Sequence, residues 1–358
     1  MATTVYVARD GTGNYNADGV ADEVEINNAI NYVYNNSGSG YTTVYLKAGT
    51  YTIKNPIRIR SGVILCGAGK DSVTIKLANN ITTDSNSAYY VPSGWENAYG
   101  PMVPLIWSYG STSYISGGKV TGSNVAVNNV EIYGITLDGN YSNNSRISRG
   151  RGYHNGIGLQ YSTNVKIHDC YFKNSAGDGA RIYGSTSTKT SNIYIYNNEA
   201  DNLGHDAVFV LYGSNVYVYG NTLEARTNSC IRFNDVTNGY IYDNILHGSL
   251  STTSNPVIQL QRHHWATMTV EVYDNIIYES YGAGMWITWG RSPQAVADSG
   301  ANTKIYIHHN FFFNNGTNHS IPYTAAIITD GMHNVLIHNN VFAGNRGGGV
   351  VIMGMTET

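Results

Sequence analysis

Charged residues are scarce in this sequence of 358 residues. Lys, Arg, Asp and Glu make up 13% of it, against about 25% in an average soluble domain. With 21 Lys and Arg against 24 Asp and Glu, the formal net charge is −3, so the chain lacks the basic field that nucleic-acid binding needs. Hydrophobic residues still make up 42%, which is enough for a folded core.

Cysteine, proline and long apolar runs are also rare or missing. Cys66, Cys170 and Cys230 are widely spaced and form no CxxC pair, so neither a disulfide framework nor a zinc site is expected. No apolar run approaches the ~20 residues of a membrane span. The start MATTVYV lacks the regions of a signal peptide. We interpret the chain as a domain of a longer protein that works outside the cell or at its surface, with further domains of the same chain as partners.

Glycine and tyrosine are abundant instead, with 40 and 30 copies, and asparagine is frequent. Together with valine, these residues are mediocre helix formers. The composition therefore argues against a helical bundle.

A short motif recurs along the chain. It alternates apolar and polar residues and usually ends in Asn, as in NVKIHDC (164–170), NIYIYNN (192–198), NVYVYGN (215–221), NGYIYDN (238–244), TVEVYDN (269–275), KIYIHHN (304–310) and NVLIHNN (334–340). Alternation with a period of two over a short run indicates a β-strand. Copies as close as 23 residues, with longer insertions elsewhere, indicate a parallel β-solenoid of about ten turns. The recurrent Asn suits a left-handed corner and a ladder of side chains.

The start of the chain predicts a cap for this solenoid. Residues 22–34, DEVEINNAINYVY, follow the pattern of an amphipathic helix. Five apolar residues lie roughly on one face: Val24, Ile26, Ala29, Ile30 and Val33. We expect this helix, within a cap of residues 1–40, to cover the open end of the core. Residues 1–358 are expected to form one all-β domain.

The segment before this helix has the spacing of a calcium-binding loop. Oxygen-bearing side chains stand at ligand positions of such a loop: Asn14, Asn16, Asp18, Asp22 and Glu25. Asn replaces the usual first Asp, and no helix precedes the loop. Two interpretations stay open, a structural calcium ion and a polar segment that leads into the helix. No cofactor is expected for catalysis itself.

Two stretches resemble known families. VYLKAGTYTI (44–53) with PIRIRSGVILCGAG (56–69) resembles the opening of the pectin-lyase-like, right-handed parallel β-helix superfamily, and the later NVxI…N turns resemble the same superfamily. The resemblance implies the fold, which lyases, hydrolases, epimerases and non-enzymes share. The opening DGTGNYNADGVADEVEINNAI (10–30) resembles the disaggregatase family of methane-producing archaea, whose enzymes degrade a chondroitin-like envelope polysaccharide.

A second strand precedes each repeat motif by about ten residues, and stacking places these strands ~4.8 Å apart in one sheet. Their entrances read His154-Asn155, Gly177-Asp178, His205-Asp206 and Asn228-Ser229. Asp178 and Asp206 should therefore lie side by side on adjacent turns, flanked by His205. Because like charges at ~5 Å raise one pKa, the pair predicts an acid and a base in one site.

Other residues of these strands should bind the substrate. Arg181 and Arg232 point outward beside the Asp pair and suit the carboxylate of a uronate. His154, Asn155 and Gln259 would line the same face, and Trp286 would stack on a sugar ring. The histidines of the repeat strands, His168, His308, His309 and His338, are interpreted as solvated and not as metal ligands.

The arrangement also resembles polygalacturonase-type β-helix hydrolases, whose Asp residues occupy strand entrances on neighbouring turns. Asp206 falls on the "DDCVAI"-like motif of that family, here HDAVFV (205–210). His205 replaces the first Asp of the motif, and NSC (228–230) stands where the family has GHG. The distribution of acid and base roles therefore stays open.

The sequence as a whole predicts an endo-acting glycoside hydrolase for an extracellular, uronate-containing polysaccharide. Asp178 and Asp206 would act as acid and base, assisted by His205 and Arg232. One alternative is a polysaccharide lyase, in which an Arg neutralises the uronate and His205 or His154 removes a proton. The other is a solenoid that binds carbohydrate without catalysis.

Overall fold

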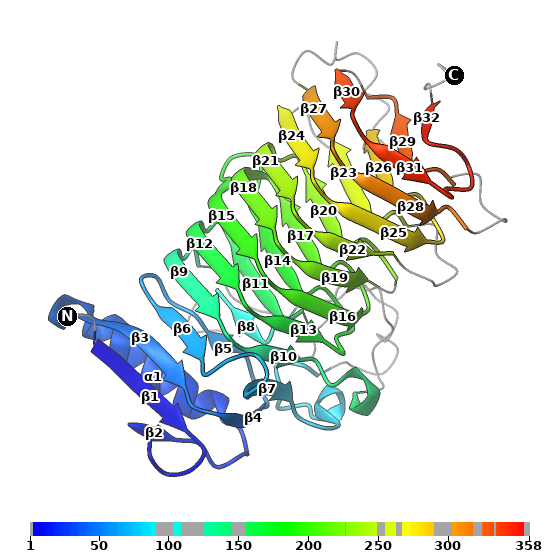
Figure 1. The fold of residues 1–358 in the computed structure, drawn as a ribbon. Coiled ribbons are helices and arrows are strands. Elements are labelled where there is room, and N and C mark those ends of the chain that lie inside the picture. Colours follow the sequence, from blue (N-terminus) through cyan, green and yellow to red (C-terminus); the bar gives the residue numbers. More distant parts are fainter. Residues whose placement is uncertain are drawn as a thin grey trace.

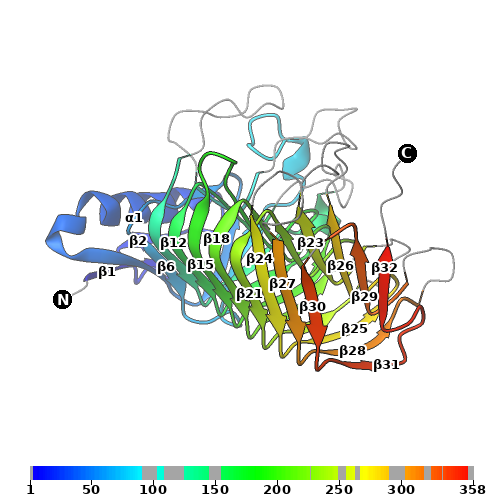
Figure 2. The same ribbon diagram turned by 90° about the horizontal axis from the view of Figure 1, so that it is seen from above.

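The computed structural model describes residues 3–90, 103–108, 125–144, 155–225, 227–248, 255–262, 267–289, 303–317, 324–332 and 334–353. Three parallel sheets of 12, 10 and 10 strands run the length of the molecule, and each turn of the chain adds one strand to each sheet (Figure 1, Figure 2). The result is a right-handed parallel β-helix. The repeat predicted a parallel β-solenoid, and the resemblance to the superfamily implied the right-handed form.

The first sheet carries the repeat motif. Its strands are β1 (Thr3–Ala8), β2 (Tyr15–Asn16), β3 (Tyr41–Leu46), β6 (Ile64–Gly67), β9 (Asn128–Tyr133), β12 (Thr163–His168), β15 (Thr190–Tyr196), β18 (Gly213–Tyr219), β21 (Thr237–Tyr242), β24 (Met268–Tyr273), β27 (Thr303–His308) and β30 (Val335–His338). The second sheet follows each motif with the apolar residues of β4 (Gly49–Ile53), β7 (Val73–Leu77), β10 (Thr136–Asp138), β13 (Tyr171–Lys173), β16 (Glu199–Leu203), β19 (Thr222–Ala225), β22 (Ile245–His247), β25 (Ile276–Ser280), β28 (Phe311–Asn315) and β31 (Val341–Ala343).

The third sheet carries the strands whose entrances hold the Asp pair. It consists of β5 (Ile57–Arg58), β8 (Ile106–Trp107), β11 (Ile157–Gln160), β14 (Ala180–Tyr183), β17 (Val208–Leu211), β20 (Ile231–Asn234), β23 (Ile258–Arg262), β26 (Met285–Trp289), β29 (Ile327–Asp330) and β32 (Val350–Met353). The inward residues of all three sheets form one continuous apolar core. Among the described residues, three short 3₁₀ helices lie in connecting segments: η1 (Ser37–Ser39) between helix α1 (Glu23–Asn35) and β3, η2 (Ile81–Thr83) between β7 and β8, and η3 (Tyr141–Asn143) between β10 and β11.

Helix α1 (Glu23–Asn35) covers the N-terminal end of the solenoid (Figure 1). Ile26, Ala29, Ile30 and Val33 are fully buried, whereas Val24 is 50% exposed. The prediction was wrong for Val24, because the buried face continues at the first turn through Glu23 instead. The Glu23 carboxylate accepts a hydrogen bond from the Lys54 N–H (2.9 Å). Among the described residues, no helix is long and apolar enough to cross a membrane.

Asparagines stack in a buried ladder where each turn passes from the first sheet to the second. Each Asn Oδ1 accepts the backbone N–H of the preceding turn, as Asn244 does for Asn221 (3.0 Å) and Asn275 for Asn244 (3.1 Å). The residue before the ladder Asn adopts the left-handed backbone, for example Asp243 (φ 54°) and Asp274 (φ 53°). The left-handed backbone and the side-chain ladder therefore belong to two neighbouring residues, whereas the sequence analysis had assigned both to the Asn.

Removing one rung of this ladder should destabilise the protein. Asn244 is 1% exposed, and its Nδ2 donates to Val218 O, Tyr242 O and Asn275 Oδ1. Asn244→Ala removes these donated hydrogen bonds and also the Oδ1 that accepts the buried Asn221 N–H, and it should cost about 2–4 kcal/mol of unfolding free energy. Asn340→Ala, at the more exposed end of the same ladder, is the control and should cost less. Equal costs in a urea titration would argue against the ladder as a source of stability.

Candidate active site

The outward side chains of the third sheet form one row across successive strands. Cα partners run from Gly158 through Arg181, Phe209, Arg232 and Gln259 to Trp286. The alternation of the strands predicted this register. It places the two arginines on either side of Phe209, with their guanidinium carbons 4.6 Å and 5.3 Å from its ring centroid.

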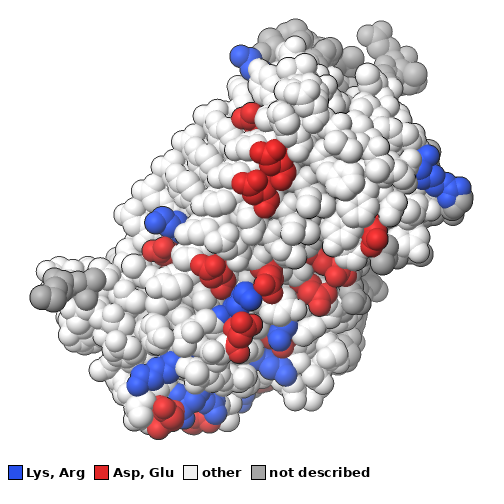
Figure 3. Space-filling view, in the orientation of Figure 1, with Lys and Arg blue, Asp and Glu red and all other residues white. Residues whose placement is uncertain are grey.

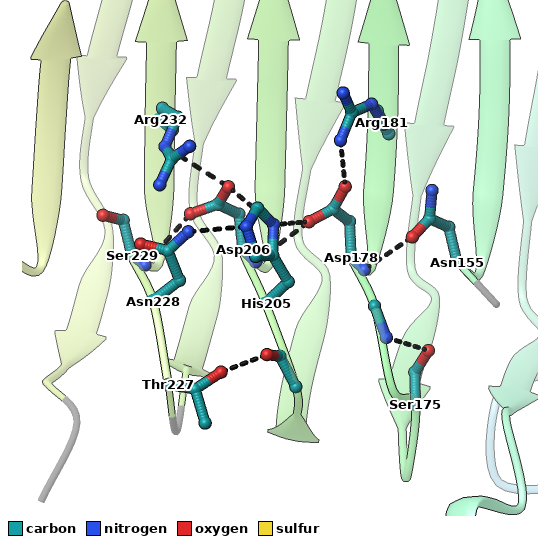
Figure 4. A network of polar contacts seen from close by, with 12 residues as sticks. Asn155, Ser175, Asp178, Arg181, His205, Asp206, Thr227, Asn228, Ser229 and Arg232 are labelled. Atoms are coloured by element: carbon teal, nitrogen blue, oxygen red, sulfur yellow. Dashed lines mark hydrogen bonds and ion pairs between the residues drawn. The ribbon is translucent and has the colours of Figure 1, made fainter. Parts of the chain in front are cut away.

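The two aspartates lie at the entrances of β14 and β17, one turn apart (Figure 4). Both are fully buried. Asp178 Oδ1 accepts the backbone N–H of Asp206 (3.0 Å), and Asp206 Oδ1 accepts that of Ser229 (3.0 Å). Asn155 Oδ1 accepts the Asp178 N–H in the same way (2.8 Å). One oxygen of each carboxylate therefore has a structural role, and Oδ2 is the one available to a reaction.

His205 lies between the two carboxylates (Figure 4). Its Nδ1 is 2.5 Å from Asp178 Oδ1 and 3.1 Å from Asp206 Oδ2. Burial lowers the pKa of His205, but the charges of Asp206 and Asp178 and the hydrogen bond to Asp178 outweigh burial and raise this pKa to about 10. The imidazole is therefore protonated at neutral pH.

Asn228 contacts the other imidazole nitrogen. Its Nδ2 lies 2.9 Å from His205 Nε2, and within the described part of the chain its Oδ1 has no hydrogen-bond partner. Turning this amide over would let Oδ1 accept the Nε2–H of a protonated His205. The sequence had placed Asn228 at a strand entrance without giving it a role.

The two arginines pair with the outer carboxylate oxygens. Arg181 Nη1 lies 3.1 Å from Asp178 Oδ2, and Arg232 Nε lies 3.4 Å from Asp206 Oδ2. The longer pair does not align as a hydrogen bond, and Asp206 Oδ2 has no hydrogen-bond partner among the described residues. Both arginine side chains are partly exposed, at 15% and 17%, as is His205 at 18%. A ligand on this face would meet three cations in front of two buried carboxylates.

The expected rise in a carboxyl pKa is not seen for Asp178. Burial raises its pKa, but His205 and Arg181 lower it more, and the result lies well below its ordinary value. The prediction treated the two aspartates as direct neighbours, whereas the structure inserts a cation between them. The group that retains a proton here is His205.

Asp178, His205 and Asp206 also have the geometry of a metal site. One ligand atom from each lies within 4.8 Å of the others, and this is the one such cluster among the described residues. The adjacent Arg181 and Arg232 already place positive charge at both carboxylates. We therefore interpret the cluster as an ion-pair network.

The side chains of the calcium motif contact their own segment. Asn14 Oδ1 accepts the Tyr6 N–H, Asn16 Oδ1 accepts the Gly13 N–H and Asp18 Oδ1 accepts the Val20 N–H. Asp22 accepts hydrogen bonds from Gly19 N–H, Thr52 N–H and Arg9 Nη1. These contacts, together with the position of Glu25 on α1, fit the alternative interpretation, a polar segment that leads into the helix.

The remaining residues singled out from the sequence lie in different places. Gln259 is 8% exposed, and its Oε1 has no hydrogen-bond partner among the described residues. Trp286 lies beside it in the outward row. His154 lies outside the described residues. The repeat-strand His168 and His308 stack between tyrosines or histidines of the first sheet.

Comparisons with known proteins agree with this architecture. No curated protein matches the sequence significantly. Among solved structures, the A-module of mannuronan C-5 epimerase AlgE6 from Azotobacter vinelandii covers 99% of this chain and 100% of its own, with 16% identity and a TM-score of 0.52. The surface adhesin PfbA of Streptococcus pneumoniae covers 99% and 91%, with 16% identity and a TM-score of 0.57. Gene product 12 of bacteriophage phi29 covers 94% of this chain and 44% of its own, with 16% identity and a TM-score of 0.59.

These likenesses concern the fold alone, since the identities are low. Family models are more specific. Residues 120–299 match a model described as a right handed beta helix region, and residues 268–358 match one described as disaggregatase related. The chain therefore belongs to the right-handed β-helix proteins, and its last quarter is similar to a family described as disaggregatase related.

Proposed function

We propose that this protein is an endo-acting glycoside hydrolase that cleaves a uronate-containing, chondroitin-like polysaccharide outside the cell. The observation that carries the proposal is the position of the His205 imidazole between two buried carboxylates, with two arginines on the exposed row beside it. Glycoside hydrolysis needs a proton donor for the leaving oxygen and a carboxylate for the anomeric carbon or a water. The disaggregatase-related last quarter supports a polysaccharide of this class.

In this proposal, His205 is the proton donor. Its Nε2–H faces Asn228, and a glycosidic oxygen would take the place of that amide. Asp206 provides the carboxylate, because its Oδ2 lacks an aligned hydrogen bond. Asp178 holds the imidazole in place and keeps it protonated. Asp178 is thus a positioning residue, where the sequence suggested one member of a catalytic acid–base pair.

Arg181 and Arg232 would bind sugar carboxylates on either side of this centre. Their stacking on Phe209 fixes the two guanidinium groups. Gln259 and Trp286, further along the row, would contact neighbouring sugars. A lyase would use the same arginines with His205 as its base, but an imidazole with a pKa of about 10 is protonated at neutral pH and would not remove a proton. The site therefore favours hydrolysis.

Product analysis tests this reaction. Purified protein is incubated with chondroitin, and the masses and the ultraviolet absorbance of the products are measured. Hydrolysis adds one water for each bond that is cleaved and produces no unsaturated uronate. Unsaturated products would contradict the proposal in favour of elimination, and the absence of products from chondroitin and other uronate polymers would favour a binding protein.

The value of kcat/KM should depend on the carboxylate groups of the substrate. Arg232→Gln should lower kcat/KM on the uronate polymer about 10- to 100-fold, because a charged hydrogen bond contributes about 1.5–3 kcal/mol. The same variant should change little on a polymer whose carboxyl groups have been reduced to alcohols. Arg60→Gln, which removes an arginine stacked on Tyr34 in the cap, is the matched control. An equal loss on both polymers would argue against carboxylate binding.

A further inference from the structure

The outer face of the first sheet carries two rows of stacked aromatic rings. One row is continuous and runs Tyr133, His168, Tyr196, Tyr219, Tyr242, Tyr273, His308 and His338. The second row contains Tyr194, Tyr217 and Tyr240, whose ring centroids are 4.9 Å apart. In such a stack each ring covers the faces of its neighbours, so an inner ring has no free face for a ligand.

The second row is interrupted at β24. Glu271 is the Cα partner of Tyr240 on one side and of Tyr306 on the other. A second row of asparagines, exposed and distinct from the buried ladder, ends at Asn238 on the adjoining strand β21. Asn238 Nδ2 donates to Asn215 Oδ1 (3.2 Å), but the next strand offers Thr269, whose hydroxyl contacts both the N–H and Oδ1 of Asn238. Two periodic rows therefore change at the same place.

This interruption leaves a slot between Tyr240 and Tyr306. The two residues are two strands apart, which is about 9.6 Å in a parallel sheet. A ring midway between them would lie about 4.8 Å from each, nearly the 4.9 Å at which Tyr217 and Tyr240 stack. The Glu271 side chain does not fill this space in the same way, since its Oε1 contacts His308 Nε2 (2.9 Å) in the neighbouring row.

Polar groups surround the slot. Asn238, Thr269, Glu271 and Lys304 line it together with the two tyrosines, and they form a solvent-open pocket of about 120 Å³. That volume is below the ~300–1,000 Å³ of pockets that enclose a whole ligand, so the slot suits a single ring of a larger molecule. The surrounding face of the first sheet carries few charged side chains (Figure 3). Two aromatic faces with hydroxyl, amide, carboxylate and ammonium groups at their edge suit a pyranose, which has apolar ring faces and polar edges.

We propose that Tyr240 and Tyr306 clamp one sugar ring of a glycan at this slot. The site lies on the first sheet, whereas His205 and the Asp pair lie on the third. It would hold a polysaccharide chain to the protein without cleaving it, as a second contact besides the catalytic face. The proposal does not depend on hydrolysis, because it requires binding alone.

The test fills the slot without removing either tyrosine. Glu271→Tyr would continue the second row of stacked tyrosines and occupy the space between Tyr240 and Tyr306. The Asp206→Asn protein, with its tyrosines ¹³C-labelled, is titrated with chondroitin tetrasaccharide and followed by NMR. The ring signals of Tyr240 and Tyr306 should shift on binding, and adding Glu271→Tyr should abolish those shifts and weaken binding at this site about tenfold or more.

Two further variants complete the design. Lys166→Tyr adds a tyrosine to the same row at its other end, next to Tyr194, and should leave binding unchanged. If Glu271→Tyr fails to fold, Tyr306→Ala should remove the clamp instead. Unchanged shifts and affinity in the filled variant would overturn the proposal, as would saturation with sugar that leaves both tyrosine signals in place. The catalytic proposal would survive either result, because product analysis tests it separately.

Discussion

Asp206→Asn should lower kcat on a uronate polysaccharide on the order of a thousandfold or more while leaving the fold intact. The substitution removes the negative charge that would act at the anomeric carbon or on a water. It preserves the structural contact, since an amide oxygen can still accept the Ser229 N–H that Asp206 Oδ1 accepts now. The activity and the melting temperature of the purified variant give both parts of the answer.

Asp138→Asn provides the matched control for this loss. Asp138 is a buried aspartate of the second sheet, 8% exposed, and its Oδ1 accepts the Asn140 N–H (2.8 Å). The same change of carboxylate to amide there should leave kcat unchanged. Normal turnover in Asp206→Asn, or an equal loss in both variants, would contradict the catalytic role of Asp206.

The stability of the protein should fall as the pH rises from about 7 to about 10. His205 has a pKa of about 10 in the folded protein and about 6.5 when unfolded. Its ion pairs therefore contribute fully below pH ~6.5, and this contribution is lost as the pH approaches the folded value. The loss should be on the order of 3 kcal/mol or more.

A variant isolates this contribution from other groups that titrate at high pH. Burial raises the pKa of the Cys170 thiol to about 12, so stability declines for more than one reason. His205→Gln removes the imidazole and should show a flatter dependence between pH 7 and 10. Urea titrations of both proteins across this range measure the difference. Parallel curves would mean that His205 titrates alike in the folded and unfolded chains.

The fold was predictable because the repeat motif occurs many times along the chain. Each copy of the motif supplies a strand of alternating burial, and each Asn such as Asn221 or Asn244 marks the same corner. The periodicity also fixed the register of the third sheet, so Arg181, Phe209 and Arg232 were expected to lie side by side. A one-residue error in that register would have turned every one of these side chains inward.

The electrostatics of the site were not predictable in the same way. Strand spacing brings Asp178 and Asp206 together, but it does not say that the His205 ring turns between them. That depends on side-chain torsions and on distances of 2.5 Å and 3.1 Å. The direction of the pKa shift is therefore reversed. The pKa of Asp178 is lowered, whereas direct repulsion between the two carboxylates would have raised the pKa of one of them.

The oxygen-rich segment before α1 shows that residue spacing alone does not identify a calcium site. The order of Asn14, Asn16, Asp18 and Asp22 matches a calcium loop, yet backbone N–H groups of the same cap approach each of these oxygens. Short polar side chains often hydrogen-bond to nearby backbone in this way. The pattern alone does not distinguish the two arrangements.

The central claim is that the proton of this site lies on His205, held by two buried carboxylates. An NMR titration of ¹⁵N-labelled histidine, with His205 assigned from the His205→Gln spectrum, measures this directly. Both ring nitrogens of His205 should remain protonated at pH 8, and the imidazole should lose its proton only near pH 10. A neutral imidazole at pH 8, titrating near the ordinary value of about 6.5, would contradict this claim.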